Sequence, residues 1–240
     1  MVVDEKKVDI RVGCANTIYG EMAVLRLLSH AASFLNLSEL GMNPEIIEKY
    51  QRILQLPFGI ILVGGPTGSG KTTTIYASIN ELDRQQNNIM TIEDPVEYRL
   101  EGINQFPVVA KADVGFASSL RAFMRMDPDI ILVGEIRDGE TARIATQAAL
   151  TRHLVLSTVH ANDAVGVAFR MVDLDVEPFL LNSVLAATIS QRMARRICPS
   201  CRTIYKPSEE DLAFYSGEME ELPNTFITVA VAHYVVEVAT

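Results

Sequence analysis

Residues 65–72 read Gly-Pro-Thr-Gly-Ser-Gly-Lys-Thr and directly follow an apolar run at residues 60–63. Glycines in this pattern leave backbone N–H groups free to point at a polyphosphate, and the helix expected next adds the positive end of its dipole. The Lys71 ammonium would reach the outer phosphates, while the Thr72 hydroxyl would complete the coordination shell of a Mg²⁺ ion. The pattern predicts a nucleotide-binding loop rather than a glycine-rich turn. The residues expected to hold the phosphates are Gly65, Thr67, Gly68, Ser69, Gly70, Lys71, Thr72 and Thr73.

Two glutamates follow apolar runs that read as strands. Glu93 comes directly after residues 89–92, and Glu135 comes after residues 130–133 and one glycine. Hydrolysis of a nucleoside triphosphate needs a carboxylate that contacts the metal shell or orients the attacking water. Ligands of open α/β sheets bind at the carboxyl ends of the strands, so either glutamate could serve. The residues alone do not decide between them.

Two histidines flank a further apolar run. His160 follows residues 154–158, at the edge where the site is expected, and could sense the γ-phosphate. His153 precedes the same run. We include His160 among the catalytic candidates and His153 among the candidate nucleotide contacts.

Arginines matter because the charge that develops in phosphoryl transfer is often stabilised by an arginine from a neighbouring domain or subunit. Arg11 and Arg26 lie in the N-terminal segment, and Arg121 and Arg125 lie one turn apart on the helix expected before Glu135. Taken alone, these residues are typical of solvated surface charges.

Cys198-Pro199-Ser200-Cys201 has the spacing of a zinc knuckle. A closed tetrahedral site needs two more ligands, no second pair follows, and Cys14 is remote in the sequence. We therefore expect Cys198 and Cys201 to form an incomplete zinc site at most.

Beyond residue 43 the chain alternates apolar strands with helices. Asn43 and Pro44 supply an N-cap and a first-turn proline for a helix that precedes the loop. The alternation predicts an α/β fold with a parallel sheet covered by helices. Together with the phosphate loop, this arrangement resembles a P-loop NTPase of the RecA-like type. Strands are expected at 60–63, 89–92, 130–133 and 154–158, and helices at 72–82, 117–126 and 141–150. Three parts are expected: 1–42, a remnant of an N-terminal domain and a linker; 43–196, the ATPase core; and 197–240, a partial cysteine subdomain and an unassigned tail.

The composition limits the classes of function. The chain has 240 residues, 48% hydrophobic and 21% charged, as in soluble globular proteins. A net charge of −9 argues against non-specific nucleic-acid binding as its main role. No apolar run reaches the roughly 18 residues of a membrane span, and the N-terminus has no signal-peptide pattern. Three cysteines fit a reducing compartment, so we expect a cytosolic protein.

Together these segments resemble the ATPases of type II secretion and type IV pilus assembly, within the secretion-ATPase superfamily. The resemblance runs from about Val8 to Pro207. It covers the phosphate loop, the acidic box Thr-Ile-Glu-Asp-Pro-Val-Glu-Tyr at 91–98, the Walker B segment at 127–138 and the histidine box at 153–163. Gln191-Arg192, with Cys198 and Cys201, is similar to the entry of the family's four-cysteine subdomain.

The resemblance implies that Glu93 and Glu135 are the catalytic carboxylates. It also implies that Arg11, Arg26 and Arg125 contact phosphates or a neighbouring subunit, and that ATP and Mg²⁺ are the ligands. The family works as a hexameric ring in which an N-terminal domain moves against the core. That motion drives a platform protein of the inner membrane, to which the cytoplasmic motor is peripheral, and extrudes a pilus or pseudopilus. Direct DNA binding is not expected.

Some features depart from the family. Arg152 stands where the family has glycine, which would crowd that turn. Because the second cysteine pair and most of the N-terminal domain are missing, we expect a truncated member or an excised core. A nucleic-acid translocase with a similar core and a nucleotide-binding module without turnover remain as alternatives. The cysteine pair favours assembly motors over pilus-retraction motors, but a DNA-uptake pilus motor is not separable by sequence.

Overall fold

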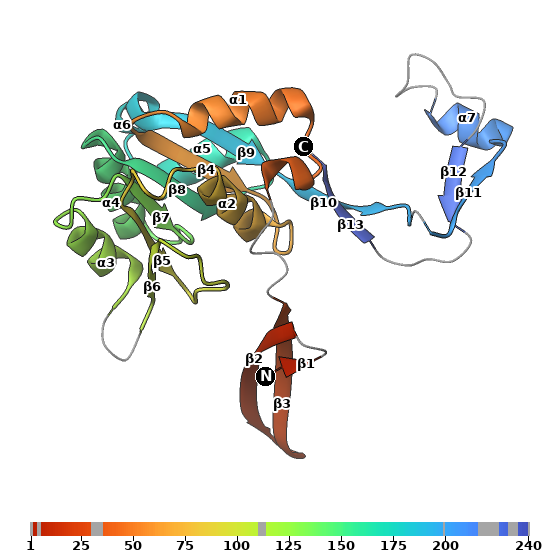
Figure 1. Cartoon of the computed structure of the whole chain (residues 1–240), viewed down its shortest axis with the longest axis horizontal. Helices are drawn as coiled ribbons and strands as arrows, with labels where there is room; N and C mark the ends of the chain where they lie inside the picture. The colour runs from red at the N-terminus through yellow and green to blue at the C-terminus, as the bar shows by residue number, and fades with distance from the viewer. Residues whose placement is uncertain are drawn as a thin grey trace.

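The computed structural model describes residues 2–3, 6–29, 36–109, 114–198, 200–215, 226–229 and 235–239. Its centre is a six-stranded sheet of order β6-β5-β7-β8-β4-β9, in which every neighbouring pair is parallel. Figure 1 shows helices on both faces of this sheet, which confirms the predicted α/β fold. The strands are β4 (Gly59–Gly64), β5 (Ile89–Glu93), β6 (Asn104–Pro107), β7 (Ile130–Val133), β8 (Leu154–Val159) and β9 (Leu185–Ser190).

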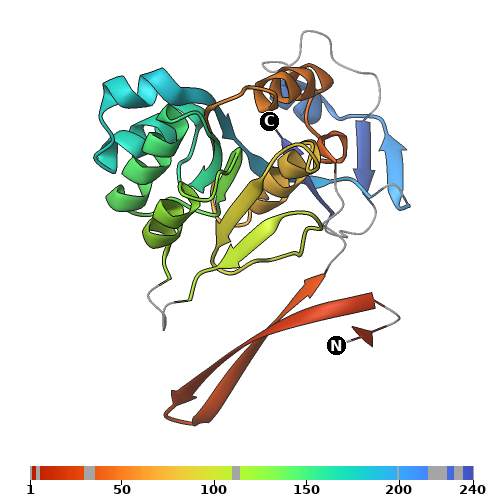
Figure 2. The same ribbon diagram turned by 60° about the vertical axis from the view of Figure 1, so that its left-hand side comes forward.

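Successive side chains of the central strands pack on opposite faces of the sheet, as strand geometry requires. Ile60 and Leu62 belong to one apolar cluster, whereas Ile61 and Val63 belong to the other. Because both faces are covered, the central strands β4, β5, β7 and β8 are buried along their whole length and are mostly apolar. The first cluster is covered by α3 (Phe116–Phe123), α4 (Gly139–Leu150), α5 (Ala164–Asp173) and α6 (Pro178–Val184). The second is covered by α1 (Pro44–Leu54) and α2 (Lys71–Asn80), and Figure 2 shows the two layers.

The first core helix begins where its cap predicts. The Asn43 side chain accepts a hydrogen bond from the Glu45 N–H at 2.9 Å, and Pro44 occupies the first turn. The packed core extends further toward the N-terminus, because the 3₁₀ helix η2 (Leu37–Glu39) contributes Leu37, which is fully buried in the second cluster.

The N-terminal segment is an antiparallel hairpin of β2 (Lys6–Thr17) and β3 (Gly20–Ser29), to which β1 (Val2–Val3) adds a short strand. In its register Arg11 lies directly opposite Arg26, so both side chains emerge on the same face. The hairpin stands apart from the central sheet in Figure 1.

Beyond the core, small antiparallel pairs extend away from the sheet in Figure 1. β10 (Arg192–Arg196) pairs with β13 (Val235–Ala239), and β11 (Arg202–Tyr205) pairs with β12 (Phe226–Val229). A short helix, α7 (Glu209–Tyr215), follows β11. Of the helices in the described ranges, none has the length and apolar character needed to cross a membrane.

Candidate nucleotide-binding site

The predicted phosphate loop connects the end of β4 to the start of α2. Lys71 is the first residue of α2, and its ammonium donates to the carbonyl oxygens of Gly65 at 2.8 Å and of Pro66 at 3.1 Å. Within the described residues no side chain caps this helix. Its first N–H groups therefore point outward without an internal partner, which is the arrangement that binds anions at helix N-termini.

Gln191 supports the base of the loop. It directly follows β9, the strand that pairs with β4, and its side chain is 1% exposed. Its amide Nε2 donates to the Ser69 carbonyl at 2.5 Å, its Oε1 accepts from the Thr74 hydroxyl at 2.8 Å, and its backbone N–H donates to the Gly64 carbonyl at 3.1 Å. A methyl group on Gly65 would collide with Ser69 Oγ and with the Gln191 carbonyl oxygen, so only glycine fits there.

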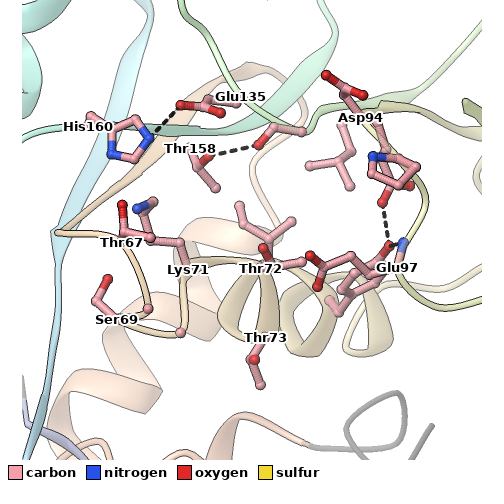
Figure 3. A pocket seen from close by; sticks show the side chains of 18 of the residues that line it. Thr67, Ser69, Lys71, Thr72, Thr73, Asp94, Glu97, Glu135, Thr158 and His160 are labelled. Atoms are coloured by element: carbon pink, nitrogen blue, oxygen red, sulfur yellow. Dashed lines mark hydrogen bonds and ion pairs between the residues drawn. The ribbon is translucent and has the colours of Figure 1, made fainter. Parts of the chain in front are cut away.

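The loop opens onto a cavity of about 740 Å³, a size typical of small-molecule and cofactor sites. Figure 3 shows Lys71 and Thr72 on one side of it and Glu135 and His160 facing them. The cavity is also lined by the hairpin arginines Arg11 and Arg26. The remaining predicted phosphate contacts that line it are Thr67, Gly68, Ser69, Gly70 and Thr73.

Glu135 lies between two basic side chains. Its Oε2 accepts from Arg137 Nε at 2.6 Å, and its Oε1 lies 2.7 Å from His160 Nε2, forming an ion pair when the imidazole is protonated. Arg137 also lies 3.7 Å from Asp94, so one guanidinium contacts acids at the ends of two strands. The sequence analysis missed Arg137; its position two residues after Glu135 is the signal that could have identified it.

Glu93, at the end of β5, is buried at 4% exposure and lines the same cavity. The neighbouring strand β7 approaches it closely, because the Gly134 N–H donates to the Ile92 carbonyl at 2.8 Å. A methyl group on Gly134 would lie 3.3 Å from the Glu93 Cα. The structure therefore brings Glu93 and Glu135 together beside Lys71.

Two buried side-chain atoms of the described residues, Arg11 Nη2 and Ser69 Oγ, have neither a hydrogen-bond nor an ion-pair partner. Glu135 Oε1 also makes no hydrogen bond, and its one near partner is His160 Nε2 at 2.7 Å, which pairs with it when the imidazole is protonated. Arg11, Ser69 and Glu135 all line this cavity. Buried polar groups are paired in most proteins, so atoms left unpaired in one place indicate a polar ligand. Burial lowers the pKa of Lys71, and the nearby Glu135 carboxylate partly offsets that effect.

Three residues predicted for the nucleotide site do not line the cavity of their own chain: Gly65, Arg125 and His153. Gly65 lies at the base of the loop. Arg125 lies beyond the end of α3 and is exposed. His153 precedes β8 and His160 follows it, so the two histidines lie at opposite ends of this strand. The Nδ1 of His153 lies 2.8 Å from the Ala148 carbonyl oxygen. The expectation that His153 binds a nucleotide in its own chain is therefore not supported by the geometry.

Cys198 and Cys201 lie in the connection between β10 and β11, where the Cys201 N–H donates to the Cys198 carbonyl at 3.3 Å. Hydrogen bonds from the backbone of Ser200 and Cys201 lower the pKa of the Cys198 thiol. No group of three or more metal-binding side chains occurs in the described ranges. Two thiolates supply only half of a tetrahedral zinc shell, so a closed zinc site does not fit these residues.

Comparisons with known proteins identify the family. A family model described as "Type II/IV secretion system protein" matches residues 1–232. Type II secretion system protein E of Klebsiella pneumoniae is 53% identical over 220 residues, which cover 92% of this chain and 44% of that protein. Type II secretion system ATPase E of Vibrio cholerae is 46% identical over 216 residues, covering 90% and 43%. The chain thus spans less than half the length of these relatives.

Solved structures show the same architecture. The pilus retraction motor PilT, crystallised with ADP, superimposes with a TM-score of 0.69 at 35% identity, covering 79% of this chain and 57% of that chain. The ATPase DotB of Legionella pneumophila superimposes with a TM-score of 0.64 at 24% identity, covering 78% and 53%, which is evidence for the fold alone. With the family match over nearly the whole chain, these similarities establish that the chain belongs to the type II/IV secretion system protein family and has its P-loop NTPase fold.

Proposed function

We propose that this chain binds ATP with Mg²⁺ and hydrolyses it, as the ATPase core of a motor that assembles a type II secretion pseudopilus or a type IV pilus. One observation carries the proposal. Unpaired buried atoms of Arg11 and Ser69, and the Glu135 carboxylate, belong to residues that line one cavity beside the phosphate loop. A triphosphate with its cation supplies the negative oxygens and the metal that such atoms require.

Each part of the cavity has a role in this proposal. Lys71 and the N-terminus of α2 bind the outer phosphates. Thr72 would hold Mg²⁺, which would supply positive charge at the phosphates. Glu93 and Glu135 orient the attacking water and the metal shell. His160 contacts the γ-phosphate while it faces Glu135.

The hairpin contributes positive charge. Arg11 and Arg26 are directly opposite each other in the register, and like charges in that position destabilise a strand pair unless an anion lies between them. A bound triphosphate is such an anion. Arg125 and His153, which lie outside their own chain's cavity, are assigned to contacts between subunits.

The expected boundary at residue 42 falls inside the packed core, because Leu37 is buried in the second cluster. We therefore propose that the N-terminal hairpin, rather than all of residues 1–42, moves against the core, and that residues 197–240 form a separate C-terminal unit. Because the hairpin and the core line one cavity, a bound nucleotide would contact both parts and draw them together. In a homo-hexameric ring, this movement would act on a platform protein of the inner membrane, with the motor peripheral to that membrane. The names of the relatives support a secretion system as the setting.

ATP hydrolysis and nucleotide binding by the purified chain test the proposal. Lys71→Ala is expected to lower both, since the main cationic phosphate contact is lost. Glu135→Gln is expected to retain binding of a non-hydrolysable ATP analogue and to lower kcat about 100-fold or more. Arg52→Ala, a control on the exposed face of α1, should leave both unchanged. Hydrolysis that is absent, or equal in all four proteins, rejects the ATPase function for this chain.

The nucleic-acid translocase is the weaker candidate. The chain carries a net charge of −9, and its relatives are secretion proteins. DNA is therefore expected to leave the ATPase rate unchanged at physiological salt. A several-fold stimulation by DNA would favour the translocase instead.

A further inference from the structure

Tyr76 connects the phosphate-binding helix to the end of a neighbouring strand. It lies on α2, one helical turn beyond Thr72, and is 1% exposed. Its ring packs edge-on against Tyr98, with 5.6 Å between ring centroids and 71° between ring planes. This contact on the ring leaves the hydroxyl directed at the end of β5.

The Tyr76 hydroxyl donates to Glu93 Oε2. The other carboxylate oxygen, Oε1, accepts from the Thr91 hydroxyl at 2.6 Å and from Gln105 Nε2 at 3.3 Å. Among the described residues no cation forms an ion pair with Glu93. A buried carboxylate without a counter-ion depends on its hydrogen bonds, so these three donors fix where it lies.

The three donors differ in what they connect. Thr91 and Gln105 tie the carboxylate to β5 itself and to the edge strand β6. Tyr76 alone ties it to α2, whose first turn carries Lys71 and Thr72. The Tyr76 hydroxyl oxygen also accepts a hydrogen bond from the Glu97 N–H at 3.4 Å, so Tyr76 contacts the segment after β5 as well.

We infer that Tyr76 is a positioning residue for the hydrolysis of ATP, which holds the Glu93 carboxylate in a fixed relation to the helix that binds the phosphates. The inference rests on the proposed ATPase function. Attack by a water molecule requires the orienting group and the phosphate to be aligned closely, and small displacements cost large factors in rate. Burial and the adjacent Glu93 charge raise the pKa of Tyr76 far above the physiological range, so its hydroxyl remains a donor.

Tyr76→Phe removes the hydroxyl and keeps the ring packing against Tyr98. The variant is expected to lower kcat about tenfold or more while KM and the affinity for a non-hydrolysable ATP analogue change less than twofold. Tyr50→Phe is the matched control, because the Tyr50 hydroxyl is also buried and also bonds to α2, at Ser78 Oγ and 2.7 Å, away from the cavity. It should lose stability without losing kcat.

The combination with Glu93→Gln shows whether the hydroxyl acts through the carboxylate. In the Glu93→Gln background, Tyr76→Phe is expected to change kcat less than twofold. The inference is overturned if Tyr76→Phe leaves kcat unchanged, if it raises KM instead, if Tyr50→Phe lowers kcat equally, or if the two substitutions multiply.

A separate measurement distinguishes failure of this inference from failure of the proposed function. Urea unfolding of the wild type, Tyr76→Phe, Glu93→Gln and the variant with both substitutions gives the coupling free energy between Tyr76 and Glu93. This measurement does not require ATP hydrolysis. If the wild type does not hydrolyse ATP, the proposed function fails. In that case non-additive stabilities still support the Tyr76–Glu93 link, and additive stabilities overturn it.

Discussion

Lys71 lies in an environment that disfavours its own charge. Burial lowers its pKa, and the ammonium donates to the carbonyl oxygens of Gly65 and Pro66. These oxygens carry only partial charges, whereas a triphosphate oxygen carries a formal one. Replacing the two carbonyls by phosphate therefore gives the ammonium a stronger partner.

Arg152 has a backbone conformation that suits glycine. Its φ of 71° lies in the left-handed region, which glycine adopts without the strain that a side chain causes. Arg152→Gly is expected to raise the free energy of unfolding by about 0.5–1 kcal/mol, measured by urea denaturation. Arg152→Ala keeps the strain and should stay close to the wild type. A loss of stability in Arg152→Gly would mean that the arginine side chain contributes more than the strain costs.

At the level of elements, α1 and α2 are joined by a buried hydrogen bond between Tyr50 and Ser78. Burial raises the pKa of Tyr50 from 10.0 to about 12. The unfolded chain therefore loses this proton first, so the contribution of Tyr50 to stability is complete below pH 10 and is lost as the pH rises through 12.

The stability advantage of the wild type over Tyr50→Phe should consequently fall by roughly 2 kcal/mol between pH 9 and pH 12. Urea unfolding of both proteins across this range measures the difference, in which the contributions of other tyrosines cancel. An advantage that does not change with pH would contradict the assignment.

Gln191 joins the phosphate loop to the strands that follow it. Gln191→Met keeps the volume but leaves the Ser69 carbonyl and the Thr74 hydroxyl without their partner. We expect a loss of about 2–3 kcal/mol in the free energy of unfolding and about tenfold weaker ADP binding, measured by urea denaturation and calorimetry. Gln147→Met, on the exposed face of α4, is the control. Unchanged ADP affinity in Gln191→Met would show that the loop keeps its shape without this support.

Several elements could be predicted from the sequence because their burial is extreme. The strands at 60–63, 89–92, 130–133 and 154–158 are buried on both faces, so apolar runs identify them. The edge strand β6 was missed, since it is short and partly exposed. Helix α3 ends three residues before the predicted end, because the N–H groups of Arg125 and Met126 bond three residues back and tighten the chain into a turn.

The site was predictable only in part, for a related reason. The carboxyl ends of parallel strands lie on the same side of a sheet, so the sequence alone predicts that Glu93 and Glu135 lie near each other. Which partners hold each carboxylate depends on side-chain directions that no local pattern encodes. The Tyr76–Glu93 contact is therefore seen only in the structure, whereas the spacing of Arg137 from Glu135 was a signal in the sequence. His153 lies before β8, away from this cavity.

On the scale of the whole molecule, the site combines residues of the N-terminal hairpin with residues of the core. Arg11 from the hairpin lines the cavity of the core and has an unpaired Nη2. Arg11→Ala is expected to weaken binding of a non-hydrolysable ATP analogue about five- to tenfold, because one charge-assisted contact to phosphate is lost. The effect should shrink at high salt. Arg52→Ala serves as the control, and equal affinities for Arg11→Ala and the wild type would remove the hairpin from the site.

Gly134, which immediately precedes Glu135, lies close to the main chain of Ile92 and Glu93. Its bare Cα lets β7 approach the main chain of Glu93, where a methyl group would already be tight. The close approach of these two segments thus depends on the lack of a side chain at Gly134. A substitution of Gly134 by a larger residue would therefore shift Glu93 relative to Glu135, although both glutamates are retained.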